Sequence, residues 1–250
     1  MLCDILNVNN QVIYTADVNA PGIDDTSVLN RIAVMDALTN GTTLAGAHIF
    51  NAQLHNVTFD GLDLTGIRLC NSTMNDCSFR GTNLTGATID FTVLSGSDFT
   101  GATLTGVNFI NVDASNSDFT DADLTNITSS NTIFSGSKFV NTKLSGANLS
   151  TTLLAYIDFT GCDMSGGIKT FENHSFTRPP LLYPTEWREL QVWDGVLTFD
   201  CQHWTFDYLQ NTITDAEIRL VGGTAGIAWW NANKSAVLQF ATDNGRINPT

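Results

Sequence analysis

The sequence is poor in charged residues, and above all in basic ones. Asp, Glu, Lys and Arg make up 14% of the 250 residues, well below the usual quarter, and 11 basic residues face 25 acidic ones. The net charge is −4 for residues 1–41, −7 for 42–166 and −3 for 167–250, which together give −14. Without a basic patch to neutralise phosphates, we expect no direct binding of nucleic acid. An acidic surface suits a basic protein partner, or simply keeps the chain soluble.

Long apolar runs are missing as well. No stretch approaches the ~20 apolar residues of a membrane-spanning helix, and the first residues lack the basic start and apolar core of a signal peptide. Five cysteines is an odd number, so a complete set of disulfides is not expected. We therefore predict no membrane span, no secretion by a signal peptide, reduced thiols and a cytoplasmic location in the producing cell.

Motifs for chemistry are absent too. The sequence holds no metalloprotease motif, nucleophile elbow or phosphate-binding loop, and its four histidines are scattered. Cys201 and His203 lie close in sequence, but two ligands do not make a zinc site. We predict that the protein is not an enzyme and has no catalytic, cofactor or metal site.

What the sequence does contain is a strict repeat. Residues 42–166 divide into 25 pentapeptides, whose central residue is Leu, Ile, Phe or Met in all but two, Ala114 and Ser129. Two residues after the centre comes Gly, Asn or Asp in 22 of 25 units, which suits tight corners. A phenylalanine recurs every 20 residues, at Phe59, Phe79, Phe99, Phe119, Phe139 and Phe159. Five-residue units nested in a 20-residue period predict a four-sided coil.

The central residues then sort into four columns, one of them the phenylalanines. In the two neighbouring columns where the exceptions fall, Phe109 is followed by Ala114, and in the next coil Ser129 is followed by Phe134. Large and small residues exchange places, which predicts that the volume of the core is conserved. Just over six coils at a spacing of about 4.8 Å predict a stack about 30 Å long.

Segments such as ADLTN (122–126), TNLTG (82–86) and CDMSG (162–166) resemble the consensus of the pentapeptide-repeat family, Ala-(Asp/Asn)-Leu followed by two variable residues. The resemblance covers half of the chain. It implies a mainly β fold, a right-handed quadrilateral β-helix with four pentapeptides to each coil.

The segments on either side lack this repeat. Residues 2–18 are typical of a hairpin about Asn9 and Asn10, and a helix over 26–39 is predicted to cover the open end of the coil, with Val28, Ile32 and Met35 as its apolar face. We expect three parts: a hairpin and capping helix (1–41), the β-helix (42–167), and a small Trp-rich α+β domain (168–250). In that last part, 191–201 is typical of two strands, and 215–221 and 225–241 of helices. This layout is similar to that of acidic pentapeptide proteins encoded by phages and prophages.

The candidate site consists of apolar residues at positions that should face solvent. In the coil they form a predicted stripe on one face and its neighbour, and two tryptophans of the tail are added to it. A fold-back of the C-terminal domain over this stripe is the structural alternative. The residues are Phe50, Phe91, Val93, Ile110, Ile133, Leu153, Tyr156, Trp229 and Trp230.

Two functions of different classes follow. The first is a structural or adaptor protein that docks other chains, as an assembly subunit or a homo-oligomer, with a phage virion component as its special case. The second resembles the quinolone-resistance pentapeptide proteins, acidic rods that mimic DNA and occupy a type II topoisomerase. The first is favoured, because acidic residues are sparse in the coil and Lys138 and Lys143 interrupt their columns.

Overall fold

The structure, a computed structural model, consists of two compact units: residues 1–153 with 157–177, and residues 154–156 with 178–250. It describes residues 2–7, 9–18, 25–170, 174–176, 179–183, 190–193, 196–199, 202–205, 209 and 215–246. Among these residues, no helix combines the length and the apolar character needed to cross a membrane.

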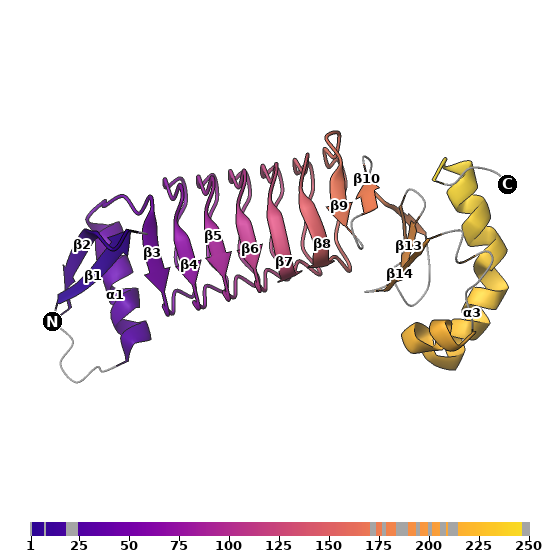
Figure 1. The fold of residues 1–250 in the computed structure, drawn as a ribbon, viewed down its shortest axis with the longest axis horizontal. Helices are drawn as coiled ribbons and strands as arrows, with labels where there is room; N and C mark the ends of the chain where they lie inside the picture. Colours follow the sequence, from indigo (N-terminus) through magenta and orange to yellow (C-terminus); the bar gives the residue numbers. More distant parts are fainter. Residues whose placement is uncertain are drawn as a thin grey trace. The chain divides into compact units, whose positions relative to one another are not determined.

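The first unit is a stack of coils preceded by a hairpin and a helix (Figure 1). Its sheet has the order β10-β9-β8-β7-β6-β5-β4-β3-β1-β2, with β3 to β9 parallel and the outer pairs antiparallel. From β3 to β7, successive strands pair residues 20 apart, as in His48, Arg68 and Thr88, whereas β8 and β9 pair residues 21 apart. The strands are β1 (Leu2–Asn7), β2 (Val12–Asp17), β3 (Ala47–Phe50), β4 (Arg68–Cys70), β5 (Thr88–Asp90), β6 (Asn108–Ile110), β7 (Thr128–Ile133), β8 (Asn148–Leu153), β9 (Ile168–Thr170) and β10 (His174–Phe176).

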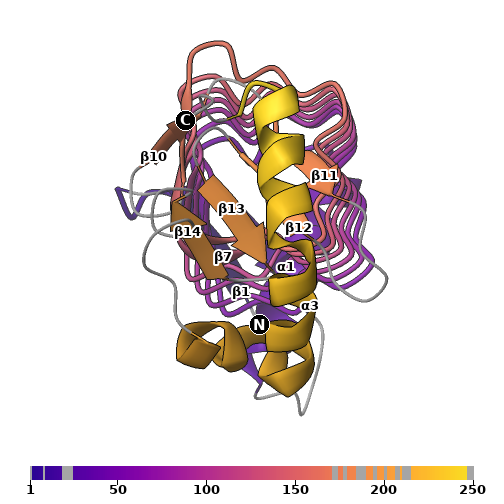
Figure 2. The ribbon, with the colours of Figure 1, turned by 90° about the vertical axis from the view of Figure 1, so that its right-hand side faces the viewer.

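The coil has four sides, as the 20-residue period predicts. Besides the strands, three further ladders of parallel bridges run along the stack, through Gln53 and Thr73, Thr58 and Ser78, and Asp63 and Asn83. Viewed along the stack, the coils lie one behind another (Figure 2). The family fold expected from the sequence, a β-solenoid, is confirmed.

The core of the coil consists of the central residues, stacked in columns. The phenylalanine rings from Phe59 to Phe119 are parallel, with centroids 4.7–4.9 Å apart, close to the spacing of the strands. Phe134 lies edge-on to Phe109 and Phe119, at 5.6 and 5.4 Å. Phe109 lies directly below Ser129 in the stack, so the ring of Phe134 contacts both the column of Ser129, at Phe109, and the phenylalanine column, at Phe119 and Phe139. The predicted exchange of volume between neighbouring columns fits this packing.

Helix α1 (Thr26–Thr39) has the predicted bounds and begins at Asp25, whose side chain accepts a hydrogen bond from Ser27 N (2.8 Å). Its predicted apolar face is wrong. Met35 is 38% exposed, whereas Ala33, Val34 and Ala37 are buried. Small side chains allow the helix to approach its neighbours closely, and the larger ones lie at the margins, half-buried.

The polar side chains of α1 complete the first coil. In later coils, carbonyl groups accept from the preceding coil: Cys70 O from Asn51 N, Thr73 O from Leu54 N and Asn75 O from Asn56 N. The equivalent carbonyls of the first coil have no preceding coil. Instead, Asn30 Nδ2 donates to Phe50 O (2.7 Å), and Arg31 Nη1 donates to Gln53 O (2.8 Å) and His55 O (3.3 Å). The helix therefore caps the stack by hydrogen bonds as well as by packing.

The corners of the coil require a left-handed backbone, supplied mostly by Gly and Asn. Gly146 has φ +73°, and a Cβ there would collide with the amide oxygen of Asn126, one coil below. Gly106, in the same corner column, has φ +68° and open space around it.

Comparing substitutions at Gly106 and Gly146 separates the cost of a left-handed backbone from the cost of crowding by Asn126. Gly106→Ala should cost about 1 kcal/mol of unfolding free energy through the left-handed backbone alone, and Gly146→Ala about 1 kcal/mol more, since Asn126 must move. Urea unfolding followed by circular dichroism measures both. Adding Asn126→Gly to Gly146→Ala should remove the extra cost; equal costs for the two alanine variants would contradict the crowding argument.

The second unit contains a four-stranded antiparallel sheet, in the order β11-β12-β13-β14, and one long helix. The predicted pair of strands over 191–201 is confirmed by β12 and β13, although the turn between them lies outside the described residues. The two predicted helices are a single one, α3. The elements are β11 (Leu181–Tyr183), β12 (Leu190–Val192), β13 (Val196–Phe199), β14 (Gln202–Thr205) and α3 (Asp215–Asp243).

Candidate protein-interaction surface

Most acidic residues of the coil stabilise its turns. The side chain of Asp63 accepts hydrogen bonds from the backbone N–H (3.0 Å) and the hydroxyl (2.6 Å) of Thr65, and these bonds lower the pKa of Asp63. The same bond to the backbone two residues later recurs along the stack. The acceptors are Asn83, Asp98, Asp113, Asp118, Asp123, Asn148, Asp158 and Asp163. These carboxylates therefore serve as turn residues.

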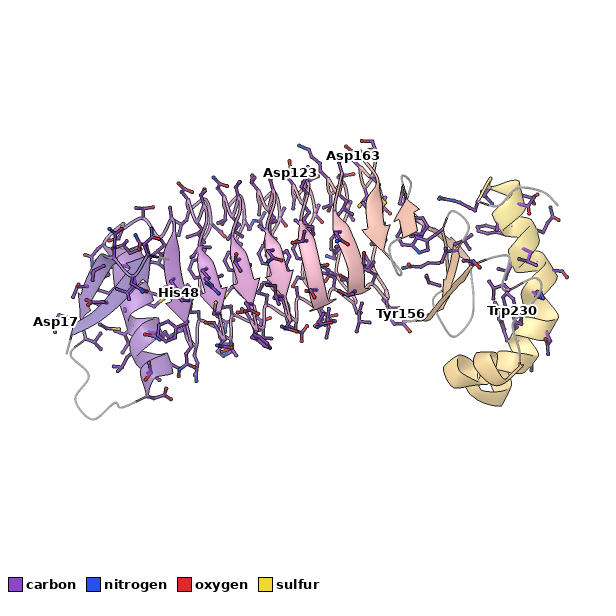
Figure 3. The ribbon with its side chains drawn as sticks, in the orientation of Figure 1. Asp17, His48, Asp123, Tyr156, Asp163 and Trp230 are labelled. Carbon is purple, nitrogen blue, oxygen red and sulfur yellow. The ribbon has the colours of Figure 1, made fainter. Side chains whose placement is uncertain are left out.

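Three cations partly neutralise the acidic columns. Arg80, Lys138 and Lys143 pair with Asp98, Asp118 and Asp123 at 3.3–3.4 Å. Partial burial raises the pKa of Asp118, but hydrogen bonds from Thr120 and the nearby ammonium of Lys138 outweigh burial and lower it overall. Asp123 and Asp163 lie along one edge of the stack (Figure 3), with Lys143 between them in the same column. Lys138 and Lys143 therefore interrupt the longest columns of acidic residues.

Two thiols, the buried Cys77 and the half-buried Cys162, belong to the structure of the corners. Cys77 Sγ donates to Leu54 O (2.8 Å), as Ser97 Oγ does to Met74 O (3.0 Å) one coil later. Cys162 Sγ donates in the same way to Phe139 O (2.7 Å). Burial raises the pKa of Cys77 to about 11 and that of Cys162 to about 12. Both thiols stay protonated near neutral pH and are poor nucleophiles.

Histidines do not assemble into a site in the described part of the chain. His48 on β3 is half-buried beside the ring of Phe50, with centroids 5.7 Å apart. Burial lowers the pKa of His48, and the charge of Arg68 lowers it further. Among the described residues, no three metal-ligating side chains lie together.

The predicted interaction residues differ in how far they reach solvent. Phe50, Phe91, Leu153 and Tyr156 are 45–59% exposed, whereas Val93, Ile110 and Ile133 are half-buried. In the second unit, Trp229 is half-buried and Trp230 is only 6% exposed. The prediction is therefore wrong for Trp230, because a buried indole offers no docking surface.

The apolar residues of the coil do not form one continuous stripe. Asp113 lies between Val93 and Ile133 in their column. Cys70 and Asp90 separate Phe50 from Ile110 in the neighbouring column. The strand register instead places these apolar residues in smaller groups. One group consists of Ile133 and Leu153, which are paired across adjacent coils.

A second group, here called the Phe91 patch, consists of Asp90, Phe91, Val93, Ile110 and Asp113 on two adjacent coils. Asp90 is paired with Ile110, and Val93 with Asp113, so each apolar residue lies beside a carboxylate of the other coil. Phe91 lies at the corner between these pairs and donates its backbone N–H to Ile110 O (2.9 Å). The patch alternates apolar and acidic side chains around one exposed ring.

The backbone of Phe91 is unusual. Its φ is +46° at a corner where Asn51, Asn71 and Asn111 hold the same place in other coils. A left-handed backbone costs a residue with a Cβ roughly 1–2 kcal/mol, although asparagine tolerates it well. Tyr156 shares this conformation (φ +57°). Sequence alone contained the signal, since Phe91 and Tyr156 replace Gly, Asn or Asp at a corner position.

Three features together define the fold: the five-residue period, the four bridge ladders and the left-handed corners. A protein-family model also matches this part of the chain. The model of "Pentapeptide repeats" matches eight copies, in segments that lie between residues 52 and 166. The repeat region belongs to the pentapeptide-repeat family. No curated protein sequence matches the chain at a significant level.

Several solved pentapeptide-repeat structures are similar to this chain. QnrB1, a plasmid-mediated fluoroquinolone resistance protein, is 24% identical over 49% of this chain and 65% of its own, with a TM-score of 0.38. A pentapeptide repeat protein from the Arabidopsis thaliana thylakoid lumen is 29% identical over 36% of this chain and 64% of its own (TM-score 0.29). Rfr23 from the cyanobacterium Cyanothece 51142 is 20% identical over 52% of this chain and 93% of its own (TM-score 0.34). The matched part of this chain thus spans less than two thirds of QnrB1 and of the Arabidopsis protein.

Proposed function

We propose that this pentapeptide-repeat protein is a non-enzymatic scaffold whose acidic coil docks other protein chains through the Phe91 patch. The observation that carries the proposal is the conformation of Phe91. Its side chain is 59% exposed at a corner with a left-handed backbone. Strained backbones are typical of functional sites, where another gain offsets their cost.

The fold itself gives Phe91 no evident compensation. Asparagine would fit the corner better, as it does in the coils immediately below and above, at Asn71 and Asn111. With 59% of its surface exposed, Phe91 also gains little from burial while the protein is alone. Contact with a partner would bury the ring, and aromatic residues are frequent anchors of protein interfaces. The rigid stack behind it would present the ring with little loss of entropy on binding.

The test is the substitution Phe91→Asn, which should change stability and binding in opposite directions. Unfolding free energy should rise by about 1 kcal/mol, because asparagine tolerates the left-handed corner. Partner proteins isolated from the native host on the wild-type chain should be lost on the variant. Quantitative affinity isolation and urea unfolding provide the two measurements.

Met35→Gln serves as the matched control, since Met35 is an exposed apolar residue on α1, far from the patch in sequence. This control should keep every partner. Retention of the same partners by Phe91→Asn would show that the ring is not the docking site.

The DNA-mimic function remains the second candidate. It is favoured by the net charge of −14 and by columns that stack Asp98 on Asp118. The bound Lys138 and Lys143 weaken it, because each interrupts such a column. Inhibition of gyrase supercoiling at sub-micromolar protein, unchanged by Phe91→Asn, would establish this candidate over the scaffold. A place in a phage virion, in the cytoplasm of the producing cell or in a homo-oligomer stays a prediction from the sequence.

A further inference from the structure

The N-terminal hairpin (β1 and β2) and α1, here called the cap, are joined to the first coil by few bonds. Among the described residues, β1 pairs with β3 through two residue pairs, one of which joins Leu6 to His48. From α1, Asn30 and Arg31 donate to carbonyl groups of the coil. Segments held by few contacts open locally more readily than the core of a fold. His48 lies at this junction, so a change in its charge acts on the attachment of the cap.

A small pocket lies between β1, α1 and β3, with His48 in its lining. Its volume is about 20 Å³, which is enough for about one water molecule. Apolar side chains form most of the lining, and the polar ones are Asp4, Asn30 and His48. His48 is half-buried beside the ring of Phe50, and its imidazole forms no hydrogen bond or ion pair among the described residues. An imidazolium ion here would lose hydration without gaining a partner.

The charges nearest to His48 by register come from the two neighbouring strands. Arg68 of β4 is its Cα partner one coil on, and in the described part of the chain Arg68 forms no ion pair. Asp4 of β1 lines the same pocket, but its carboxylate already accepts a hydrogen bond from Thr15 Oγ1 (2.6 Å). Burial is the larger cause of the lowered pKa of His48, and the charge of Arg68 is the second.

The other titratable groups of the cap are bound elsewhere. On α1, Arg31 donates to backbone carbonyls, and Asp36 accepts a hydrogen bond from Tyr14 Oη (2.6 Å). On β1, the thiol of Cys3 is directed at Asn30 Oδ1 (3.7 Å), and burial raises the pKa of Cys3. None of these groups is bound to the imidazole of His48.

We propose that His48 is a pH-sensitive latch between the cap and the first coil, whose protonation weakens the attachment of the cap. The imidazolium would lie opposite the guanidinium of Arg68 on the neighbouring strand, and like charges at paired positions destabilise a sheet. Opening of the cap would leave β3 as an uncovered edge strand, open to pairing with another chain.

The direction of the pH dependence follows from the lowered pKa of His48, because the folded chain then favours the neutral imidazole. The attachment of the cap is at full strength above about pH 6.5, the ordinary pKa of histidine. It weakens as the pH falls below that value and His48 takes up its proton.

The experiment measures amide hydrogen exchange by NMR on the full-length 15N-labelled protein, between about pH 7.5 and about pH 5.5. Protection factors correct for the intrinsic pH dependence of exchange. For the amides of Ala33, Val34 and Ala37 in α1, they should fall about three-fold as the pH is lowered. Those of Phe99 and Phe119, in the middle of the stack, should stay constant.

Two variants and a control assign the effect. His48→Gln should abolish the pH dependence. Arg68→Gln should reduce it, because the pKa of His48 then rises toward its ordinary value, which a titration of the imidazole signals measures directly. His55→Gln removes the other histidine of the first coil, which does not line the pocket, and should leave the pH dependence unchanged.

A pKa of His48 at or above its ordinary value would overturn the proposal. Protection of α1 that does not change with pH would overturn it as well. A pH dependence that persists in His48→Gln would show that another group is responsible. An unchanged pH dependence in Arg68→Gln would overturn the role of the opposed cations.

Discussion

Replacing Phe119 with alanine is expected to lower the unfolding free energy of the coil by about 3–5 kcal/mol. Phe119 is fully buried and stacks on Phe99 and Phe139, with centroids 4.8 and 5.0 Å away. Phe134 meets it edge-on at 5.4 Å. Truncation removes three ring contacts, and the stacked backbones above and below are held apart by their hydrogen bonds, so the cavity has little room to collapse. Urea unfolding of the wild type and the variant, followed by circular dichroism, measures the loss.

The matched control is Phe59→Ala, at the N-terminal end of the phenylalanine column. Phe59 is also buried, but its ring stacks on Phe79 alone among the described rings (4.9 Å). Its coil is next to α1 rather than in the middle of the stack, so the site can relax more easily, and the cost should be smaller. A loss below about 1 kcal/mol for Phe119→Ala would mean that the coil collapses around the void, against the rigidity assumed for the scaffold.

The repeat region could be predicted closely because its determinants are local. Each corner needs a left-handed residue and each centre a large apolar one, and these needs recur every five residues. The bounds of α1 followed from Asp25 and Asn40 for the same reason, since capping residues act on their immediate neighbours. The buried face of α1 depends instead on the shape of what it packs against. Ala33 and Ala37 were therefore missed in favour of larger residues.

Helix α3 shows a similar limit. Gly222 and Gly223 interrupt the helical pattern, and each glycine costs a helix about 1 kcal/mol relative to alanine. The sequence therefore predicts two helices where the structure has one continuous helix of 29 residues. Propensity is a weak prior that the rest of a fold can override.

The candidate site was predicted only in part, because neighbours across coils matter more than neighbours along the chain. Phe91, Val93 and Ile110 were recognised as apolar residues in outward positions. They are not contiguous with Ile133, since Asp113 lies between Val93 and Ile133 in their column. The unpartnered oxygen of Asp90 could not be found from sequence, because burial without a hydrogen-bond partner is a property of the folded chain alone.

The last prediction concerns Ser129, where the family pattern asks for a large apolar residue. Ser129→Leu would restore that pattern, yet we expect it to lower the unfolding free energy by about 2–6 kcal/mol, the sum of two costs. The ring of Phe134 lies edge-on to Phe109 (5.6 Å), the residue of this column in the coil below, so a leucine at position 129 would overfill the core, at about 1–3 kcal/mol. The substitution also removes the hydroxyl that donates to Asn148 O (3.2 Å) and pairs with Thr152 Oγ1, leaving a buried hydroxyl unsatisfied, at about 1–3 kcal/mol.

The double variant Ser129→Leu with Phe134→Leu separates these two costs. It restores the family residue in both columns and removes the ring that causes the overfilling, while the hydrogen bonds of Ser129 stay lost. If volume is exchanged between the columns, the double variant should be more stable than the sum of the single losses by about 1–2 kcal/mol. Additive losses in urea unfolding would mean that Phe134 and Ser129 are independent, and that hydrogen bonding alone explains the serine. A favourable coupling would show that the residues of neighbouring columns in this core depend on one another. A residue that fits the family pattern can then still destabilise the fold at a particular position.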